Sequence, residues 1–378
     1  MQNKNSYNRY QRQIILKELG SNGQQKLFKA KVLVVGAGGL GCPALQYLAA
    51  AGVGTIGIVD FDVIELSNLQ RQTLYNIDDI GKYKAITAIQ KLQAFNPEIN
   101  FITHCLKLTN INALSIIVNY DIVLDGTDNF ATRYLINDAC TILNKPLIYG
   151  AILRFEGQVG VFNCLDKEKN LQTNYRDLFP EPPEPTEVLS CNEAGVLGVL
   201  PGIIGTLQAT EVIKIITQIG KPLYNKILSY NVLNNFFYEF DVSINKNNQT
   251  IIPQTKTEFE NFNYDWFCGI KKQPNEISIN DFEALRTNEN ITIIDVREYD
   301  EMPFVVEFKH IQIPLSLFEN KISNQTLTNK IVVFCQSGKR SLQALKMIQE
   351  KNPAIQVFSL HGGIEAWKKH QLKNLINQ

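Results

Sequence analysis

The chain has 378 residues, of which 44% are hydrophobic and 20% charged, and its formal net charge is zero. These values are ordinary for a globular protein with more than one domain, and they argue against nucleic acid as the main partner. The polar N-terminus predicts no secretory signal, and the apolar run 194–207 is too short to span a bilayer, so we expect a cytoplasmic protein without a membrane partner. Seven scattered cysteines without a C-x-x-C pair fit a reducing compartment.

The first part of the chain alternates predicted strands with predicted helices. Residues 1–30 read as a helical arm, and later helices are expected to begin near Leu40, Lys84 and Asn129. The strands are expected at Val32–Val35, Thr55–Val59, Asn100–His104, Ile122–Asp125, Pro146–Tyr149 and Gln158–Asn163. This alternation predicts an α/β fold with a doubly wound, mostly parallel, Rossmann-like sheet, whose ligands bind at the carboxyl ends of strands.

The rest of the chain predicts a loop, a linker and a second domain. The stretch 165–190 lacks periodicity and is rich in proline, which predicts a long mobile loop before Cys191. A helix at about 202–219 and strands within 225–242 complete a first domain placed at 1–244, and the polar stretch 245–278 predicts a linker. Residues 279–378 form a small α/β domain with a helix from Ser341 to Lys351 and strands Thr292–Asp295, Ile331–Phe334 and Gln356–Leu360.

A glycine-rich turn follows the first strand directly. Gly36, Gly38 and Gly41 have the G-x-G-x-x-G spacing, which lets a phosphate approach the backbone at a helix N-terminus. Asp60, at the end of the second strand, can accept hydrogen bonds from a ribose. Taken alone, these residues favour an NAD-dependent oxidoreductase.

Further charged residues favour ATP instead. Arg12, Arg71 and Lys84 are cations that could neutralise a triphosphate, although each of them singly is also typical of a solvated surface. Asp128 follows the strand that ends at Asp125, where it could bind Mg²⁺ or cap the next helix. Adenylyl transfer needs such an array, because charge builds up on the α-phosphate and on the departing pyrophosphate.

Several motifs in order resemble the MoeB/ThiF/HesA family, whose members are relatives of the ubiquitin-activating enzymes. They are RYQRQIIL, VGAGGLGCP, DFDVIELSNLQRQTL, GTDNFATR and the stretch that begins at Cys191, and they lie between residue 7 and about residue 240. The resemblance implies ATP, Mg²⁺ held by Asp128, and adenylation of the C-terminal glycine of a ubiquitin-like sulfur carrier. It also implies that Arg12 reaches into the site of a partner subunit in a homodimer. The implied nucleotide positions are Gly36, Gly38, Gly39, Gly41, Asp60, Asp62, Ser67, Asn68, Leu69, Gln70, Arg71, Lys84, Asp128 and Asn129.

Two features of the family are open in this chain. Cys191 is either a thiol that attacks an acyl-adenylate or a persulfide, or a small buried residue. Family members usually carry a structural zinc on two C-x-x-C pairs, where this chain has Asn174, Asp177, Asp265 and Cys268. One thiolate, two carboxylates and an amide make a poor zinc site, so we predict no zinc.

A second chemical centre is expected around Cys335, which follows a strand and begins a loop that leads into a helix. The loop amides and the helix dipole stabilise an anionic sulfur, and Lys339 and Arg340 are expected to add positive potential. The remaining residues of this loop are Gln336, Ser337, Gly338 and Ser341.

The second unit resembles a rhodanese domain, through 294–298, 310–314, the Cys335 loop and 361–367. The resemblance implies that Cys335 carries a persulfide. Gln336 replaces an arginine found in many such loops, and a phosphatase with a loop longer by one residue is a weaker alternative. Asp295 and Arg297 could also form an internal salt bridge.

Together these motifs predict a fused adenylyltransferase and sulfurtransferase that converts the Gly-Gly end of a sulfur carrier to a thiocarboxylate, with sulfur from Cys335. The expected sulfur donor is a cysteine desulfurase or thiosulfate. The stretches SNLQRQTL and GTLQATEVIK favour a carrier of molybdopterin biosynthesis, and thiamine or tRNA-thiolation carriers are the alternatives. An NAD oxidoreductase and a non-catalytic binding module are more distant ones.

Overall fold

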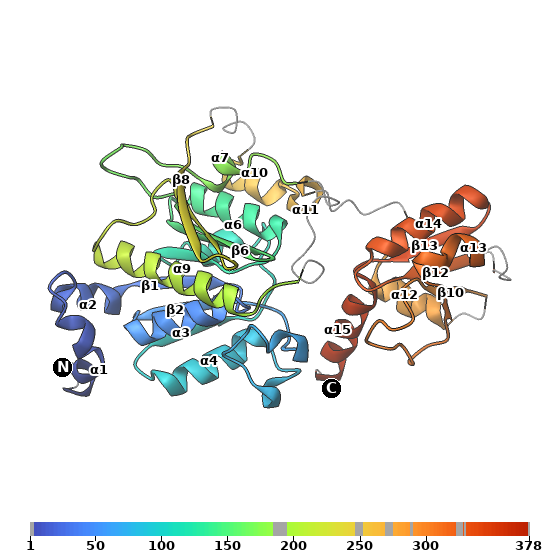
Figure 1. Cartoon of the computed structure of the whole chain (residues 1–378), viewed down its shortest axis with the longest axis horizontal. Helices are drawn as coiled ribbons and strands as arrows, with labels where there is room; N and C mark the ends of the chain where they lie inside the picture. The colour runs from blue at the N-terminus through green and yellow to red at the C-terminus, as the bar shows by residue number, and fades with distance from the viewer. Residues whose placement is uncertain are drawn as a thin grey trace. The chain divides into compact units, whose positions relative to one another are not determined.

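The computed structural model describes residues 4–183, 195–245, 252–268, 275–287, 290–322, 328 and 330–376. The chain divides into two compact units, Met1–Ile270 and Lys271–Gln378 (Figure 1). Each unit is built on its own β-sheet with helices on both faces, so the prediction of an α/β fold is confirmed.

The sheet of the first unit has the strand order β3-β2-β1-β4-β5-β6-β7-β8. The pairs from β3 to β5 are parallel and those from β5 to β8 are antiparallel. The strands are β1 Lys31–Val35, β2 Thr55–Val59, β3 Asn100–His104, β4 Ile122–Asp125, β5 Leu147–Leu153, β6 Glu156–Phe162, β7 Lys226–Asn231 and β8 Phe236–Asp241. The central strands are runs of buried apolar residues, as expected where helices cover both faces of a sheet.

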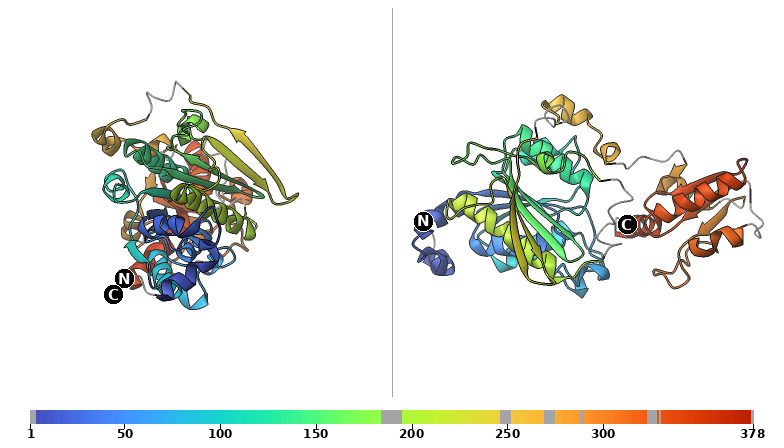
Figure 2. Two further views of the ribbon diagram at one scale, coloured as in Figure 1. Left: turned by 90° about the vertical axis from the view of Figure 1, so that its left-hand side faces the viewer. Right: turned by 45° about the horizontal axis from the view of Figure 1, so that its top comes forward.

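Two hydrophobic cores lie on opposite faces of this sheet. Figure 2 shows the helices that cover both faces. The first core contains side chains of α2, α3, α4 and α9, and the second contains side chains of α5, α6, α7 and α10. The helices of the unit are α1 Lys4–Ile14, α2 Gly20–Lys29, α3 Gly41–Ala51, α4 Lys84–Phe95, α5 Ala113–Ile117, α6 Phe130–Ile142, α7 Tyr175–Leu178, α9 Val199–Thr217, α10 Lys256–Asn261 and α11 Tyr264–Phe267, with short 3₁₀ turns η1 Leu66–Asn68 and η2 Ile77–Asp79.

Helix α9 begins and ends a few residues earlier than the stretch of about 202–219 that the sequence predicted. Within the described residues it is the one helix long and apolar enough to cross a membrane. However, it packs against α2, α3, β5 and β6. Its apolar composition is therefore explained by its place in the helical layer that covers the sheet.

The stretch 245–278 is not a linker throughout, contrary to the prediction. Helices α10 and α11 pack against α6, and Phe259 and Tyr264 are buried in the second core. The expectation of an irregular loop at 165–190 also fails in part. Asn174 caps α7 within that loop, because its side chain accepts a hydrogen bond from the Arg176 amide.

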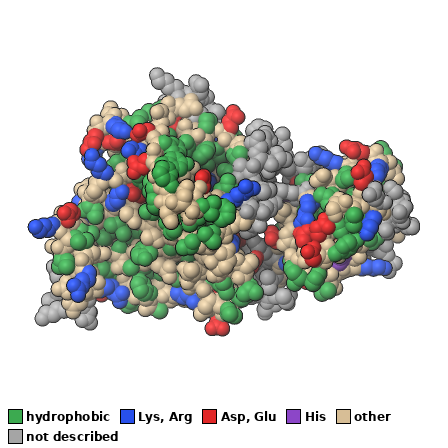
Figure 3. Space-filling view, viewed as in Figure 1, with side chains coloured by type: hydrophobic (Ala, Val, Ile, Leu, Met, Phe, Trp, Pro, Cys, Tyr) green, Lys and Arg blue, Asp and Glu red, His purple; other side chains and the backbone are tan. Residues whose placement is uncertain are grey.

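Strand β8 ends the sheet and leaves aromatic side chains exposed. Phe236 and Tyr238 are exposed and Phe240 is half-buried, and the three rings follow one another on one face with centroids 6.1 and 6.2 Å apart. Figure 3 shows hydrophobic side chains gathered over this part of the first unit.

The second unit has a parallel sheet of order β11-β10-β12-β13-β9. Its elements are β9 Glu276–Ile277, α12 Ile279–Arg286, β10 Thr292–Asp295, β11 Ile311–Gln312, η4 Leu315–Leu317, α13 Phe318–Lys321, β12 Lys330–Phe334, α14 Lys339–Lys351, β13 Gln356–Leu360 and α15 Gly363–Ile376. One core lies under α13 and α14, and the other lies under α12 and α15. Ordered pairing in this unit begins at β9, inside the predicted linker.

Candidate active sites

The glycine turn between β1 and α3 is packed so tightly that only glycine fits at two positions. Gly36 has φ +93°, and a Cβ there would lie 2.7 Å from the oxygen of Gly126. A Cβ at Gly41 would lie 1.9 Å from the oxygen of Gly36. The turn therefore presents bare backbone at the N-terminus of α3, which suits a phosphate.

Asp60 anchors this turn from the end of β2. Its Oδ2 accepts a hydrogen bond from the Ala37 amide and its Oδ1 one from the Asp62 amide, both at 2.8 Å. Burial raises the pKa of Asp60, and the charge of Lys84 opposes that shift. Because each carboxylate oxygen can accept a further donor, the predicted ribose contact remains compatible with this role.

Lys84 begins α4 and faces a group of carboxylates. Its Nζ lies 3.2 Å from Asp62 Oδ2, and its side chain is only 9% exposed. Burial works against its charge, but Asp60 and Asp62 outweigh that effect and raise its pKa, with a smaller contribution from Asp128. The fold thus brings Lys84 together with three of the predicted acidic residues.

The residues of η1 and of the segment that follows it make different kinds of contact. Arg71 donates from Nη1 to the oxygen of Ser67 at 3.0 Å, and its Cγ lies 3.5 Å from the position of a Cβ at Gly39. Asn68 is buried and accepts a hydrogen bond from the Glu65 amide, so it stabilises η1.

Leu69 and Gln70, which lie between Asn68 and Arg71, make packing contacts. Leu69 packs against the first core, and the oxygens of Gln70 lie against Gly198 at the start of α9. Their predicted nucleotide contacts stay predictions.

Gln72 and Pro201 were not among the predicted site residues, yet both adjoin the glycine turn. Gln72 is 3% exposed, and its Nε2 lies 3.6 Å from the position of a Cβ at Gly38. Its Oε1 is buried without a hydrogen-bond partner in the described part of the chain, so it is an acceptor available to a ligand or to water. Pro201 covers Gly39, whose added Cβ would lie 3.1 Å from the proline Cβ.

The loop after β4 is held by a buried ion pair. Arg133 Nε lies 3.3 Å from Asp125 Oδ2, and its Nη2 donates to the oxygen of Thr127 at 3.1 Å. Asn129 is the N-cap of α6, because its Oδ1 accepts from the Thr132 amide at 2.9 Å. The expectation that Asp128 caps this helix is therefore wrong, and its exposed carboxylate is available to a cation.

Arg12 does not reach the glycine turn within one chain. It is exposed in the last turn of α1, and α1 is held through Tyr10. The Tyr10 hydroxyl accepts from Asn96 Nδ2 at 2.8 Å, and its ring packs on Gly52. Gly52 follows the C-terminal end of α3, opposite the end that carries the glycine turn.

The residues at the family's zinc positions do not fit zinc. Asp177 Oδ2 accepts from the backbone and the side chain of Asn174, at 2.8 and 2.9 Å, and its Oδ1 accepts from the Asn245 amide. Cys268 is buried, and burial raises its pKa to about 12, which disfavours the thiolate that zinc requires. No cluster of three or more metal-binding side chains occurs in the described ranges.

The two segments that would have held the metal are both bonded to Asp138 of α6. Arg176 of α7 donates to both oxygens of Asp138 in α6, at 2.8 and 2.7 Å, and both side chains are fully buried. Tyr264 of α11 donates to Asp138 Oδ2 at 2.9 Å. The guanidinium lies 4.9 Å from the Tyr134 ring and 4.6 Å from the Phe267 ring. We call Arg176, Asp138 and Tyr264 the α7–α11 clasp.

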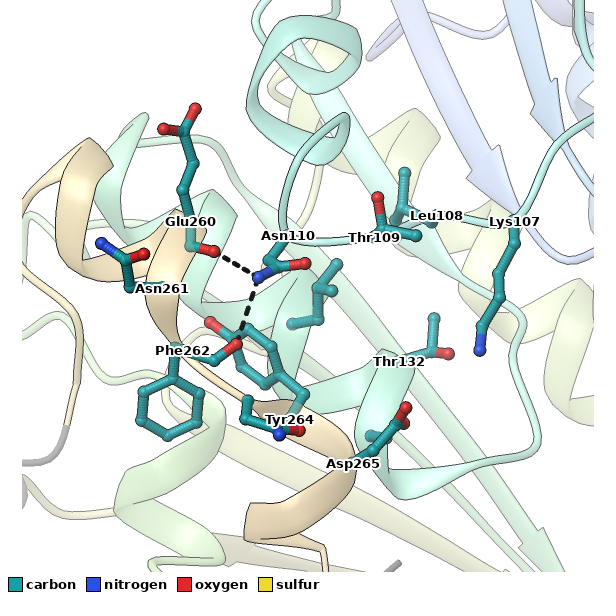
Figure 4. Close-up of a pocket in the computed structure, with 13 residues that line it drawn as sticks. Lys107, Leu108, Thr109, Asn110, Thr132, Glu260, Asn261, Phe262, Tyr264 and Asp265 are labelled. Atoms are coloured by element: carbon teal, nitrogen blue, oxygen red, sulfur yellow. Dashed lines mark hydrogen bonds between the residues drawn. The ribbon is translucent and has the colours of Figure 1, made fainter. Parts of the chain in front are cut away.

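A cavity of about 390 Å³ lies beside this region, between residues 107–110, the first turns of α6 and residues 260–265 (Figure 4). Asn110 closes one side by donating to the backbone oxygens of Glu260 and Phe262. None of its lining residues belongs to the predicted nucleotide set.

Cys335 occupies the predicted position between β12 and α14. Its Sγ accepts a hydrogen bond from the Gly338 amide at 3.2 Å and lies 3.6 Å from Ser341 Oγ. The side chain is 1% exposed. The backbone of α15 closes the loop from behind, because the Ile364 amide donates to the Cys335 oxygen at 2.9 Å.

Neighbouring charges of this loop are paired. Arg340 forms a bidentate ion pair with Glu301, at 2.5 and 2.6 Å, so a carboxylate offsets part of the positive potential that it was expected to add. Gln336 Oε1 accepts from Arg297 and its Nε2 donates to Glu365, both at 3.2 Å. Arg297 and Asp295 form the expected buried salt bridge at 2.7 Å. The side chain of Lys339 and all of Cys191 lie outside the described residues.

Comparison with known proteins agrees with this geometry. Residues 10–251 match the model of the ThiF family, and residues 278–370 match that of the rhodanese-like domain. The chain belongs to the ThiF family. It is an adenylyltransferase of that family with a C-terminal sulfurtransferase domain.

Two curated relatives and one solved structure are similar over most of the first unit or more. The probable adenylyltransferase/sulfurtransferase MoeZ of Mycobacterium tuberculosis is 41% identical over 97% of this chain and 94% of its own length. The sulfur carrier protein adenylyltransferase of Thermus thermophilus is 47% identical over 71% of this chain and 98% of its own. A crystal structure of E. coli MccB with AMPCPP and MccA is 25% identical, covers 63% of this chain and 72% of that one, and has a TM-score of 0.54.

Proposed function

We propose that the first unit uses ATP and Mg²⁺ to adenylate the C-terminal glycine of a ubiquitin-like sulfur carrier, and that the second unit provides sulfur on Cys335. The observation that carries this proposal is the meeting of Lys84, Asp60, Asp62 and Asp128 beside a glycine turn that admits no Cβ. The similarity to a relative named as a sulfur carrier protein adenylyltransferase supports the choice of substrate.

The residues around the turn fit ATP. Backbone amides at the N-terminus of α3 suit phosphate oxygens, and Lys84 and Arg71 supply positive charge where pyrophosphate would depart. The unpartnered Oε1 of Gln72 is an acceptor beside the turn that could bind a hydroxyl or amino group of the nucleotide. Asp128 would hold Mg²⁺, which when bound neutralises charge on the phosphates and acts as a Lewis acid.

The second unit is proposed to carry the sulfur. The Gly338 amide and the N-terminus of α14 stabilise negative charge on Cys335 or on its terminal persulfide sulfur. That sulfur attacks the carbonyl carbon of the acyl-adenylate, and AMP leaves with the electrons of the broken C–O bond. We propose that Cys191 then attacks the Cys335 sulfur, which releases the thiocarboxylate and leaves a disulfide for a reductant to open.

Three finer points belong to the same proposal. The enzyme acts as a homodimer in which Arg12 completes the site of the partner, because Arg12 is far from the glycine turn of its own chain. The carrier belongs to molybdopterin biosynthesis, as the stretches SNLQRQTL and GTLQATEVIK suggest. The protein works in the cytoplasm, with a cysteine desulfurase or thiosulfate as the donor.

The proposal is tested by ATP–pyrophosphate exchange with each candidate carrier in turn, followed by mass spectrometry of the carrier. We expect exchange with one carrier and a thiocarboxylate after a sulfur donor is added. Cys335→Ala should keep the exchange and lose the thiocarboxylate. Absence of exchange with every carrier would reject adenylation, and loss of both activities in Cys335→Ala would reject the division of roles.

A further inference from the structure

A bidentate ion pair lies at the end of the Cys335 loop, where α14 begins. Arg340, in the first turn of α14, donates from Nη1 and Nη2 to the two carboxylate oxygens of Glu301, at 2.5 and 2.6 Å. The two side chains are 34% and 28% exposed. The hydrogen bond from Arg340 lowers the pKa of Glu301, so the pair is formed throughout the neutral range.

This pair lies within electrostatic reach of the reacting sulfur. Arg340 directly precedes Ser341, whose Oγ lies 3.6 Å from Cys335 Sγ. A negative charge on Cys335 is among the interactions that stabilise the charge of Arg340. The cation beside the sulfur is therefore already neutralised by a carboxylate from a different segment of the chain.

A small anionic sulfur donor that approaches Cys335 encounters the Glu301 carboxylate as well as the Arg340 guanidinium. Thiosulfate carries two negative charges, and its sulfonate needs a cation close to the sulfur that Cys335 attacks. To use Arg340 it must displace Glu301, whose freed carboxylate then repels it at short range. A donor with less negative charge is repelled less by the Glu301 carboxylate.

We propose that Glu301 is a specificity-determining residue of the sulfurtransferase reaction, and that it disfavours dianionic sulfur donors by holding Arg340. The reaction concerned is attack of the Cys335 thiolate on the outer sulfur of the donor. A new S–S bond forms on Cys335, the S–S bond of thiosulfate breaks, and sulfite leaves with its electron pair. Cyanide then removes the outer sulfur as thiocyanate and restores the thiolate. The inference rests on Cys335 as the sulfur carrier of the proposed function.

The test compares Glu301→Gln with Glu298→Gln in the full-length protein. Gln at 301 keeps an oxygen for the Glu298 amide, which donates to Glu301 at 2.8 Å, but it removes the charge that holds Arg340. Glu298→Gln removes a charge of the same sign from the same segment, where the carboxylate accepts from Ser316 at 3.1 Å. Thiocyanate formation is measured with thiosulfate, a dianion, and with methanethiosulfonate, a monoanion.

We expect Glu301→Gln to raise kcat/KM for thiosulfate about fivefold, through a lower KM, and to change the value for methanethiosulfonate by less than about twofold. The double variant Glu301→Gln/Arg340→Gln should lose this gain, because the freed guanidinium produces it. Equal gains with both donors, or the same gain in Glu298→Gln, would overturn the proposal. The gain would then come from the change in net charge and not from the release of Arg340. Loss of activity with both donors in Glu301→Gln would also overturn it, since the pair would then only support the loop. Cys335→Ala abolishes thiocyanate formation if Cys335 carries the sulfur. Thiocyanate formation that persists in this variant would reject the proposed function itself, and this outcome is distinct from a failure of the inference about Glu301.

Discussion

Lys84 Nζ lies 3.2 Å from Asp62 Oδ2 at the start of α4, where the lysine side chain is almost fully buried. A lysine in such a position is held by carboxylates on one side and is poised to meet the charge of a nucleotide on the other. The raised pKa of Lys84 keeps it charged at neutral pH, which adenylyl transfer requires.

Lys84→Met should therefore lower the rate of ATP–pyrophosphate exchange by at least about 100-fold, which is typical for removal of a group that stabilises transition-state charge. The control is Lys82→Met, because Lys82 is 54% exposed and pairs only with Asp79 in the described structure. Similar exchange rates in the two variants would contradict the assignment of Lys84. Thermal unfolding of both variants checks that the fold is kept.

Mixing two inactive variants tests the role of Arg12. Arg12→Ala and Lys84→Met are each expected to be inactive in exchange. In a mixed dimer, however, one site receives a wild-type Arg12 and a wild-type Lys84. Random exchange of subunits makes half of the dimers mixed, so about a quarter of the wild-type activity should return. If the subunits exchange and the mixture stays inactive, Arg12 acts in the site of its own chain or in neither site.

The α7–α11 clasp predicts stability without a metal. Arg176→Met leaves Asp138 buried without its cation and should lower the free energy of unfolding of the first unit by about 3–5 kcal/mol. Tyr264→Phe removes one hydrogen bond to Asp138 and should cost about 1 kcal/mol. Urea unfolding measures both values.

Metal removal gives an independent check of the clasp. We expect a strong zinc chelator to leave the unfolding midpoint of the wild-type protein unchanged, and elemental analysis to find no stoichiometric zinc. A chelator that lowers the midpoint would contradict this prediction.

The buried cysteines predict an order of alkylation with pH. Burial raises the pKa of Cys42 and Cys268 to about 12 and also raises that of Cys140, so the reactive thiolate forms only well above neutral pH. Cys105 is exposed. Iodoacetamide at pH 8 should modify Cys105 before Cys42, Cys140 and Cys268, and modification of Cys42 should stay slow until about pH 10 or until the protein unfolds. Peptide mass spectrometry at several pH values measures this order. Rapid modification of Cys42 at pH 8 in the folded protein would contradict it.

The parts of the fold that were predictable are those with a strong local pattern. Strands Thr55–Val59 and Ile122–Asp125 are runs of buried apolar residues, and the structure places them at those residues. Helices α10 and α11 were missed, because polar residues surround the few aromatic anchors, such as Phe259 and Tyr264, that pack on the core. Which of two neighbouring residues caps α6 depends on side-chain geometry, and the chain uses Asn129 rather than Asp128.

The sites show the same division between local pattern and distant contact. The glycine turn and the Cys335 loop are visible as motifs because their spacing along the chain is fixed by the chemistry. The pairing of Arg340 with Glu301 joins residues far apart in sequence, and composition carries no sign of it. The burial of Gln72 beside Gly38 is likewise a result of how η1 packs, although its place in the LQRQ stretch is a signal that could have included it.

The attachment of α1 through Tyr10 has a consequence for association. Tyr10 is 2% exposed, bonded to Asn96 and packed on Gly52, so the helix turn that carries Arg12 is held in place within a single chain. An arm that is already rigid loses little conformational entropy when two copies meet. In the proposed homodimer, more of the free energy of the contacts made by the arm would then remain for holding the two copies together.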